Sequence, residues 1–285
     1  MIDPAPQQGL PHALALRALA VGDRASRELA DSLALLEHAL PTRFVPTLSA
    51  AIAHWSPDVV PPDLLVLLQS HSGQFLESEL LGLRSRMPLA RTVVVLGSWC
   101  DGEMRSGRPL VGVRRVAWHA WPLRLVRELA AWQAGGGGTW ALPATAAEEE
   151  LLLEADGPAL VPRSAGNDGP IAVRTSNTDF AACLVEGLAR YGYQAVALPC
   201  GQASAAEPFS ALIDDLRLPT DGRELSSVYH QWRPRPIVAL ADFPRPHDER
   251  LIREAGATLL MAKPLDFAEL APQLDRLKKR GRELS

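Results

Sequence analysis

The distribution of apolar and polar residues in the C-terminal half predicts strands that alternate with helices. Within one predicted helix, Phe180, Leu184 and Leu188 recur at helical spacing, and Asp179 is placed to cap its start. The predicted strands cover residues 170–174, 194–198, 210–213, 237–240 and 258–261, and the predicted helices cover 180–190, 221–232, 247–254 and 266–279. Strands and helices alternating at this length predict a parallel sheet with right-handed crossovers.

The N-terminal half repeats this pattern more loosely. Its predicted strands cover residues 17–22, 43–46, 63–68, 92–96 and 113–118, and its predicted helices cover 25–40, 48–55 and 123–132. After Asp63 and Thr92, with which they begin, the strands at 63–68 and 92–96 are entirely apolar, as buried parallel strands should be. The chain is therefore predicted to be α/β, with two domains of one architecture in tandem at 13–132 and 169–285.

The remaining segments are predicted to lie outside both domains. Residues 133–168 form a linker that begins with a run of four consecutive glycines, which lose much conformational entropy when they adopt regular structure. Within it, Thr145 and Glu148 match a capping box for a short helix at 150–153. Residues 1–12 are expected to be a disordered lead-in.

Composition narrows the class of protein. A length of 285 residues suits two domains of about 150 residues each. The formal net charge of −4 gives no sign of a nucleic-acid partner. Cys100, Cys183 and Cys200 lack metal-ligand or redox spacing, so we expect reduced thiols in a cytoplasmic protein. No apolar run approaches the ~20 residues that span a bilayer, and no signal peptide is recognisable.

Two strand ends in the second half carry candidate chemistry. Asp215 stands at the end of an apolar strand and is followed by Leu-Arg-Leu-Pro, and Lys263-Pro264 ends another strand. This spacing matches a phosphoryl-accepting pocket, where a carboxylate accepts the group and a lysine neutralises it. Over residues 169–280 the chain resembles the response-regulator receiver domain of the CheY-like superfamily.

The resemblance implies several further features. These are a doubly wound, flavodoxin-like sheet of five parallel strands in the order 2-1-3-4-5, Asp215 as phospho-acceptor, Lys263 as its phosphoryl-pairing group, and a cis peptide before Pro264. Residues 13–132 then form a second, more divergent receiver-like domain. In receivers a face near the last strand commonly serves for partners, which here corresponds to residues 247–255 and 266–277.

The second half departs from the receiver pattern at two places. Thr175, Ser176 and Asn177 stand where the family has the acids that hold Mg²⁺. Ala241 replaces a hydroxyl residue, and Asp242 after it would repel a phosphoryl group. We therefore expect Asp215 and Lys263 to form an ion pair without a metal, while Asp214 points to the opposite face of the strand. No cofactor is expected, and Mg²⁺ only if Asp215 accepts a phosphoryl group.

The first half has lost the pattern altogether. Its third strand ends at Leu68-Gln69 where an acceptor would stand, and Trp121-Pro122 takes the place of the Lys-Pro pair. At most one acid, Asp23, follows its first strand. We expect no phosphoryl chemistry in this half.

The loop at residues 97–109 is the least ordinary segment, because it replaces a helix expected between two strands. Together with the end of the next strand it forms a possible recognition surface, since Trp and Arg are common interface anchors. Its candidate residues are Trp99, Cys100, Asp101, Arg105, His119 and Trp121. A nucleophile Cys100 with His119 as its base is an alternative, although no partner acid can be named. A second alternative is that the tryptophans pack the loop onto the sheet.

The leading hypothesis is a non-catalytic signalling or interaction protein that acts through protein–protein contacts, with a homodimer as one form. One alternative is an active response regulator that uses Asp215 in a phosphorelay. The other is an enzyme or small-molecule binder centred on Cys100, Asp101 and His119. Neither a nucleic-acid nor a membrane partner is expected.

Overall fold

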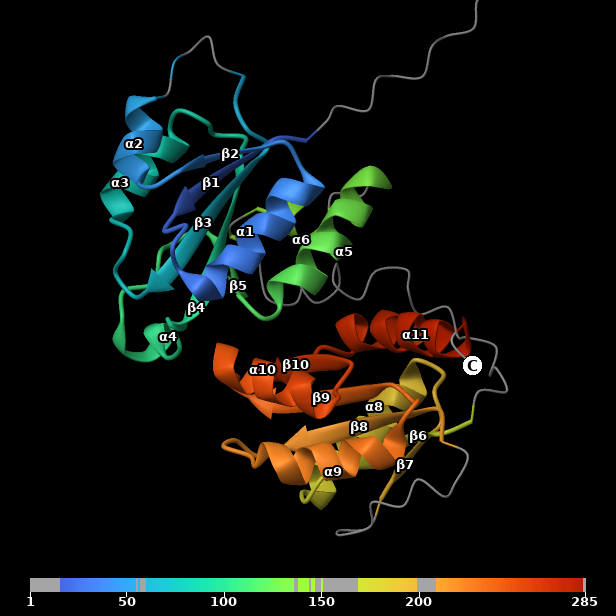
Figure 1. Ribbon diagram of the computed structural model, residues 1–285. Helices are drawn as coiled ribbons and strands as arrows, with labels where there is room; N and C mark the ends of the chain where they lie inside the picture. Colours follow the sequence, from blue (N-terminus) through green and yellow to red (C-terminus); the bar gives the residue numbers. More distant parts are fainter. Residues whose placement is uncertain are drawn as a thin grey trace, which may run out of the picture.

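The computed structural model describes residues 16–54, 56, 60–135, 138–143, 145, 146, 150, 169–198 and 209–283 (Figure 1). The predicted lead-in at 1–12, nearly all of the predicted helix at 150–153, and Cys200 lie outside the described residues. The described chain forms two α/β domains, here called the first domain (16–143) and the second domain (169–283).

The first domain contains one sheet of five parallel strands in the order β2-β1-β3-β4-β5. The strands are β1 (Ala18–Gly22), β2 (Thr42–Val45), β3 (Leu64–His71), β4 (Arg91–Trp99) and β5 (Arg114–Ala117). The helices are α1 (Arg27–Ala39), α2 (Leu48–Ala53), α3 (Glu77–Arg84), α4 (Glu103–Ser106) and α5 (Trp121–Gln133). Alternate residues of β3 face α1 and α5 on one side and α2 and α3 on the other, which makes the sheet doubly wound.

The second domain has the same plan. Its strands are β6 (Ile171–Arg174), β7 (Ala195–Ala197), β8 (Ala211–Leu216), β9 (Ile237–Asp242) and β10 (Leu259–Lys263), in the order β7-β6-β8-β9-β10. Its helices are α8 (Thr178–Arg190), α9 (Gly222–Trp232), α10 (Pro246–Ala255) and α11 (Phe267–Glu283). Both sheets follow the strand order 2-1-3-4-5, so the predicted tandem of flavodoxin-like, receiver-type domains is confirmed.

Local details correct the sequence analysis at three places. Helix α3 was not predicted. Helix α8 is capped by Asn177, whose side chain accepts from the amides of Asp179 and Phe180, so Asp179 already lies inside the first turn. The end of the glycine run is not free of structure, because Gly138–Ala141 form a helical turn, α6.

Helix α6 belongs to the core of the first domain. Trp140 is buried and stacks on Trp121, with ring centroids 5.6 Å apart. The buried Glu128 carboxylate accepts from the amide of Trp140 at 3.0 Å and from the hydroxyl of Thr139. A buried carboxylate needs such donors, and α6 supplies them. The first domain therefore extends past residue 132, where the sequence had placed its end.

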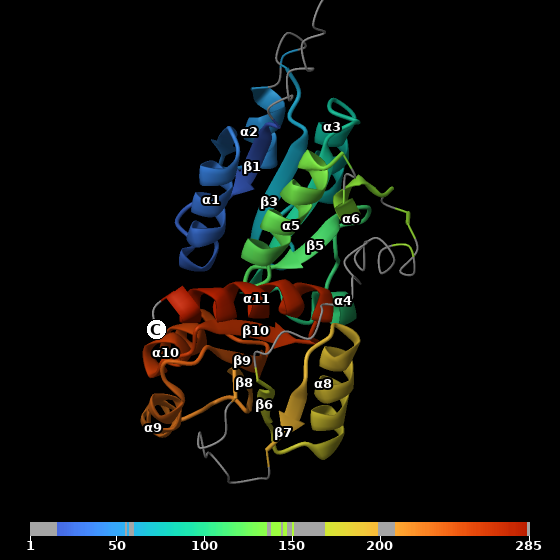
Figure 2. The same ribbon diagram turned by 90° about the vertical axis from the view of Figure 1, so that its right-hand side faces the viewer.

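The two domains contact each other where the first turns of α5 meet the start of α11, and one end of α5 points toward α11 in both views (Figures 1 and 2). Arg124 of α5 pairs with Glu269 of α11 at 2.9 Å, and Leu123 packs against the apolar core of the second domain. The carboxyl end of the first sheet faces the second domain near α4 and β10 (Figure 2).

Candidate functional site

Four side chains meet at the carboxyl edge of the second sheet and form what we call the acceptor pocket: Thr175, Asp215, Asp242 and Lys263. Parallel strands end at the same edge, and β10 pairs with β9 so that Lys263 lies opposite Asp242. The ammonium Nζ of Lys263 donates to Asp215 Oδ1 at 2.7 Å and contacts Asp242 Oδ2 at 2.8 Å. The Thr175 hydroxyl donates to the other oxygen of Asp215, Oδ2, at 2.6 Å. Both oxygens of the candidate acceptor are therefore engaged by the protein itself.

The charge of Lys263 is held in place by these contacts. Burial alone would lower the pKa of Lys263, but the hydrogen bonds to Asp215 and Asp242 raise it above its ordinary value. The Phe180 ring lies 5.5 Å from the ammonium and adds a cation–π contact. The predicted ion pair between Asp215 and Lys263 is present, but it is not isolated, because Asp242 is a second partner of the lysine. The Lys263–Pro264 peptide is cis, as the resemblance implied.

The pocket does not fit the Mg²⁺ ion that the receiver resemblance implies. Mg²⁺ needs several oxygen ligands in near-octahedral geometry. Thr175 follows β6 where an acid would stand, and its hydroxyl is directed to Asp215. Among the residues that the structure describes, no group of three or more His, Cys, Asp or Glu side chains could hold a metal ion. The two carboxylates of the pocket are instead bridged by an ammonium group.

Asp214 belongs to a separate, buried network on the other face of β8. The guanidinium of Arg174 donates to it twice, from Nε to Oδ1 at 2.6 Å and from Nη2 to Oδ2 at 2.5 Å. The hydroxyl of Tyr229 donates to Oδ2 at 2.9 Å. Burial and the neighbouring Asp214 carboxylate raise the pKa of Tyr229, so this hydroxyl stays protonated. The sequence analysis missed Arg174 and Tyr229, although Arg174 ends the strand that pairs with Asp214 in register.

Strand register shows what replaces the acceptor pocket in the first domain. Asp215 follows Ala211 and Ile213 on the face that α8 and α11 cover, and the matching column of β3 ends at Leu68. The last paired residues of β4 and β5 are Leu96 and Ala117. The next residue after β5, Trp118, therefore takes the position that Lys263 has in the second domain. Leu68 is 1% exposed and Trp118 is 9% exposed. The edge of the first domain thus holds apolar side chains where the second domain holds charges.

This register corrects the predicted place of Trp121. Strand β5 ends at Ala117, and Trp121 is already the first residue of α5. Trp121 is fully buried, and its indole Nε1 donates to the carbonyl of Ser32 at 3.0 Å. It is a core residue and not part of an exposed recognition surface.

The loop at 97–109 is fastened to the first sheet by one buried acid, Glu103. Its carboxylate accepts from Gln69 Nε2 at 2.8 Å, from Ser72 Oγ at 2.9 Å and from Arg115 Nη2 at 2.5 Å. Burial on its own would raise the pKa of Glu103, but these three hydrogen bonds lower it below its usual value. The sequence analysis did not single out Glu103. A polar Gln69 at the end of an otherwise apolar strand was the available signal.

Cys100 and His119 are not arranged as a nucleophile and base. The Cys100 thiol is buried and directed to the carbonyl of Gln69 at 3.4 Å. Burial raises its pKa to about 12. Burial lowers the pKa of His119 to about 4, and its ring meets the edge of Trp118. No hydrogen bond joins the two side chains in the described part of the chain, and a thiol with so high a pKa is a poor nucleophile.

The other predicted recognition residues point to different surroundings. Trp99 is 78% exposed, and Arg105 is exposed on the short helix α4. Asp101 and His119 instead line a cleft of about 300 Å³ between the two domains. The cleft is also lined by Ala117, Ala120, Leu123, Arg124, Phe243, Leu260, Met261, Ala262, Lys263, Pro264, Asp266 and Glu269. Part of the predicted surface therefore faces the second domain of the same chain.

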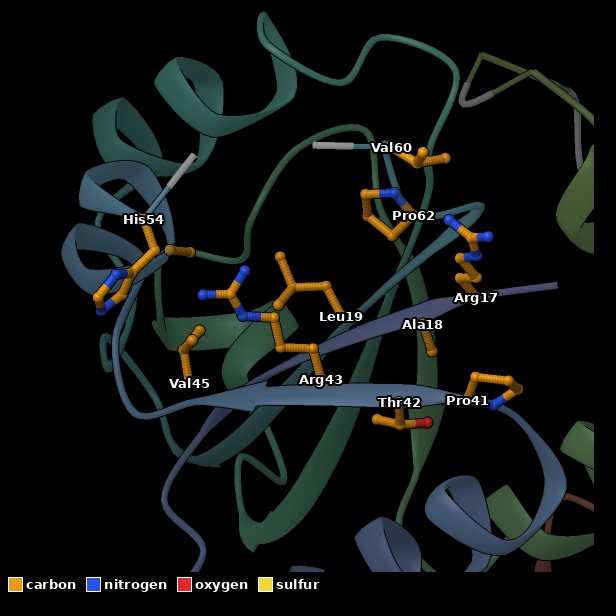
Figure 3. Close-up of a pocket in the computed structure, with 11 residues that line it drawn as sticks. Arg17, Ala18, Leu19, Pro41, Thr42, Arg43, Val45, His54, Val60 and Pro62 are labelled. Atoms are coloured by element: carbon orange, nitrogen blue, oxygen red, sulfur yellow. The ribbon is translucent and has the colours of Figure 1, made fainter. Parts of the chain in front are cut away.

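A second cavity lies at the opposite end of the first sheet. It has a volume of about 440 Å³ and lies beside the starts of β1 and β2, with Arg17, Leu19, Arg43 and Pro62 among its walls (Figure 3). None of the residues that the sequence analysis selected lines it. Ligands of open α/β sheets bind beyond the carboxyl ends of the strands, which is the other edge.

The matches to known proteins come from solved structures, and those described here each cover about 40% of this chain. No family model matches the chain, and no curated protein matches it. Among solved structures, the chain is similar to the chemotaxis protein CheY4 of Vibrio cholerae, with 18% identity over 38% of this chain and 98% of that chain and a TM-score of 0.34. A CheY-like response regulator of Mesorhizobium loti has 20% identity over 39% and 98%, with a TM-score of 0.33. A CheY-like receiver domain protein of Methanospirillum hungatei has 17% identity over 41% and 98%, with a TM-score of 0.34.

No helix in the described ranges combines the length and the apolar character needed to cross a membrane. The flavodoxin-like fold of both domains follows from the topology of the two sheets, each with five parallel strands in the order 2-1-3-4-5.

Proposed function

We propose that this chain is a non-catalytic signalling protein whose two receiver-type domains act through protein–protein contacts. The observation that carries the proposal is the filled acceptor pocket. Lys263 bridges Asp215 and Asp242, and Thr175 donates to the remaining oxygen of Asp215. In this arrangement Asp215 is an internal ion-pair partner.

Electrostatics supports a silent acceptor. An incoming phosphoryl group brings about −1.5 to −2 of charge, which a receiver offsets with a divalent metal and a lysine. Here the single positive charge of Lys263 already faces two carboxylates, and Thr175 and Ser176 stand where the metal-binding acids would be. The first domain offers even less, because Leu68 and Trp118 occupy the matching positions.

Labelling with acetyl phosphate and Mg²⁺, followed by intact-mass measurement, tests this proposal. We expect no mass gain for the native chain. The variant Thr175→Asp/Ser176→Asp restores two acids after β6, and we expect it to gain a phosphoryl group that Asp215→Ala then removes. A gain in the native chain that disappears in Asp215→Ala would show that the acceptor is active.

An active phospho-acceptor remains the second candidate, because the 2.7 Å contact between Lys263 and Asp215 is also what phosphoryl transfer needs. The same labelling experiment separates the two. The enzyme hypothesis has no comparable support, since the Cys100 thiol is buried and is not among the described residues that line the cleft beside His119.

A further inference from the structure

We propose that the first domain is the resident partner of the second domain. It docks on a face formed by β10 and the first turns of α11, here called the docking face (residues 260–270), and keeps other proteins from this face. The inference rests on the proposed function, because this face overlaps residues 266–277, through which we expect partner contacts. It also gives Asp101 and His119 of the predicted recognition surface a ligand, which is the second domain.

Ion pairs join the two domains at the docking face. Arg124 of α5 lies 2.9 Å from Glu269 and 3.8 Å from Asp266, and Arg127, one helical turn further, lies 3.7 Å from Asp266. The Glu269 side chain is only 8% exposed. Two basic residues on one side of α5 thus meet two acidic residues at the start of α11. This match of charge across two domains indicates a specific interface.

The burial of Glu269 shows what these pairs contribute. Burial raises the pKa of Glu269, and the Arg124 guanidinium only partly opposes this effect. A buried ion pair of this kind adds little net stability, but removing one partner leaves an uncompensated charge. The pairs therefore fix which surfaces meet, and a change of sign on one side disfavours the docked state strongly.

Apolar contact accompanies the charges. Leu123 packs against the core of the second domain, in the cluster that contains Met261 and Leu270. Beside it, Asp101 and His119 face Lys263 and Pro264 across the interdomain cleft. The low pKa of His119, about 4, keeps its ring uncharged at neutral pH, so it enters this contact without a buried charge.

The covalent link favours docking within one chain. Residues 144–168 connect the two described domains, and a linker that lets both sites engage gives an effective concentration in the millimolar range. A contact with a dissociation constant of about 0.01 mM would then be closed roughly 99% of the time. An outside partner of the docking face would see its apparent affinity fall by the same factor of about 100.

Charge reversal on full-length chains tests the docking. Arg124→Glu/Arg127→Glu should open the chain, seen as a larger radius of gyration in X-ray scattering and at least tenfold faster hydrogen exchange over residues 260–270. Asp266→Arg/Glu269→Arg should do the same, and the four changes together should close it again. Arg190→Glu, which breaks an exposed ion pair with Glu186 on α8, is the matched control and should change neither readout. Unchanged exchange protection in β3 and β8 shows that both domains remain folded.

Mixing the two open variants tests whether the docking face selects its partner. The first domain of each variant is complementary in charge only to the second domain of the other. We therefore expect each variant alone to be monomeric and open, and the mixture to form a reciprocal dimer in analytical ultracentrifugation. An Arg124→Glu/Arg127→Glu chain that keeps the native scattering and exchange, or a mixture that stays monomeric, would overturn the proposal. These readouts are independent of phosphoryl labelling at Asp215, so the failure of either proposal is recognisable separately.

Discussion

Asp214 and Asp215 are adjacent acids whose removal should have very different consequences. Asp214 is 1% exposed and satisfies both Arg174 and the buried hydroxyl of Tyr229. Asp214→Ala leaves a guanidinium and a phenol without their acceptor. Removing one partner of a buried pair costs about 3–5 kcal/mol, and we expect the second domain to lose this much stability.

Asp215→Ala should lower the stability of the second domain much less. Lys263 keeps its contact with Asp242 at 2.8 Å, and Asp242 is largely exposed, so the ammonium retains a partner and water. The Thr175 hydroxyl is also only partly buried and can bond to water. The loss is then that of one charged hydrogen bond, about 1.5–3 kcal/mol at most.

Native-state hydrogen exchange resolves the two variants within the full chain. A loss of 3 kcal/mol speeds exchange of the core amides of β8 and β9 by more than about 100-fold. The amides of β3 belong to the first domain and should not change, which makes them an internal control. Asp214→Asn, which keeps the shape and one acceptor oxygen, should fall between Asp214→Ala and the native chain. Equal effects of Asp214→Ala and Asp215→Ala, or a larger effect of Asp215→Ala, would refute this division of roles.

Three further predictions follow from burial and charge. With a pKa of about 12, the Cys100 thiol is ionised in only about one molecule in 10,000 at pH 8. Iodoacetamide should therefore label the exposed Cys183 in the folded protein and Cys100 only after denaturation, and labelling of Cys100 at a comparable rate would contradict its burial. Glu103→Ala removes the acceptor of Arg115, so proteolysis and exchange within 97–109 should accelerate at least tenfold while β3 stays protected. Because the folded pKa of Lys263 is raised, its contribution to stability is present below its unfolded pKa of about 10.5 and is lost as pH rises through the folded pKa. The stability of the second domain should therefore fall less steeply at alkaline pH in Lys263→Met than in the native chain, and identical curves of stability against pH would argue against the bridge.

The fold was predictable because its signals are local. Apolar runs such as residues 64–68 have the length and composition of strands buried on both faces of a sheet, and amphipathic stretches such as 180–190 alternate with such strands. Because parallel strands end at the same edge of a sheet, the proximity of Asp215 and Lys263 could be predicted without knowing the side chains around them. The ends of the strands were predicted less accurately than their existence. Strand β4 runs on to Trp99, because its pairing with β3 resumes at His71 and Trp99 after a register shift that follows Gln69.

The errors concern features that depend on register or on distant partners. The predicted strand already ended at Trp118, but the Lys-Pro pair was matched to Trp121-Pro122 on the dipeptide alone, three residues too late. The indole of Trp121 is placed by a hydrogen bond to Ser32, 89 residues away in sequence. Asp242 was interpreted only as a charge that would repel a phosphoryl group, because Lys263 had been assigned to Asp215 alone. One ammonium group donates to several acceptors, so this assignment was never exclusive.

The two domains differ at the strand ends that correspond to the acceptor pocket, and the difference bears on the contact between them. In the first domain Leu68 and Trp118 turn the strand ends into core, so the edge needs no charge. In the second domain Lys263 is held by two carboxylates at the end of β10, and the chain passes from it directly into α11. Asp266, three residues later, accepts from the amide of Ala268 and also faces the arginines of α5. The ionic bridge therefore holds the end of β10 within the docking face, and in the proposed docking the charges at Lys263 support the domain contact without phosphoryl transfer.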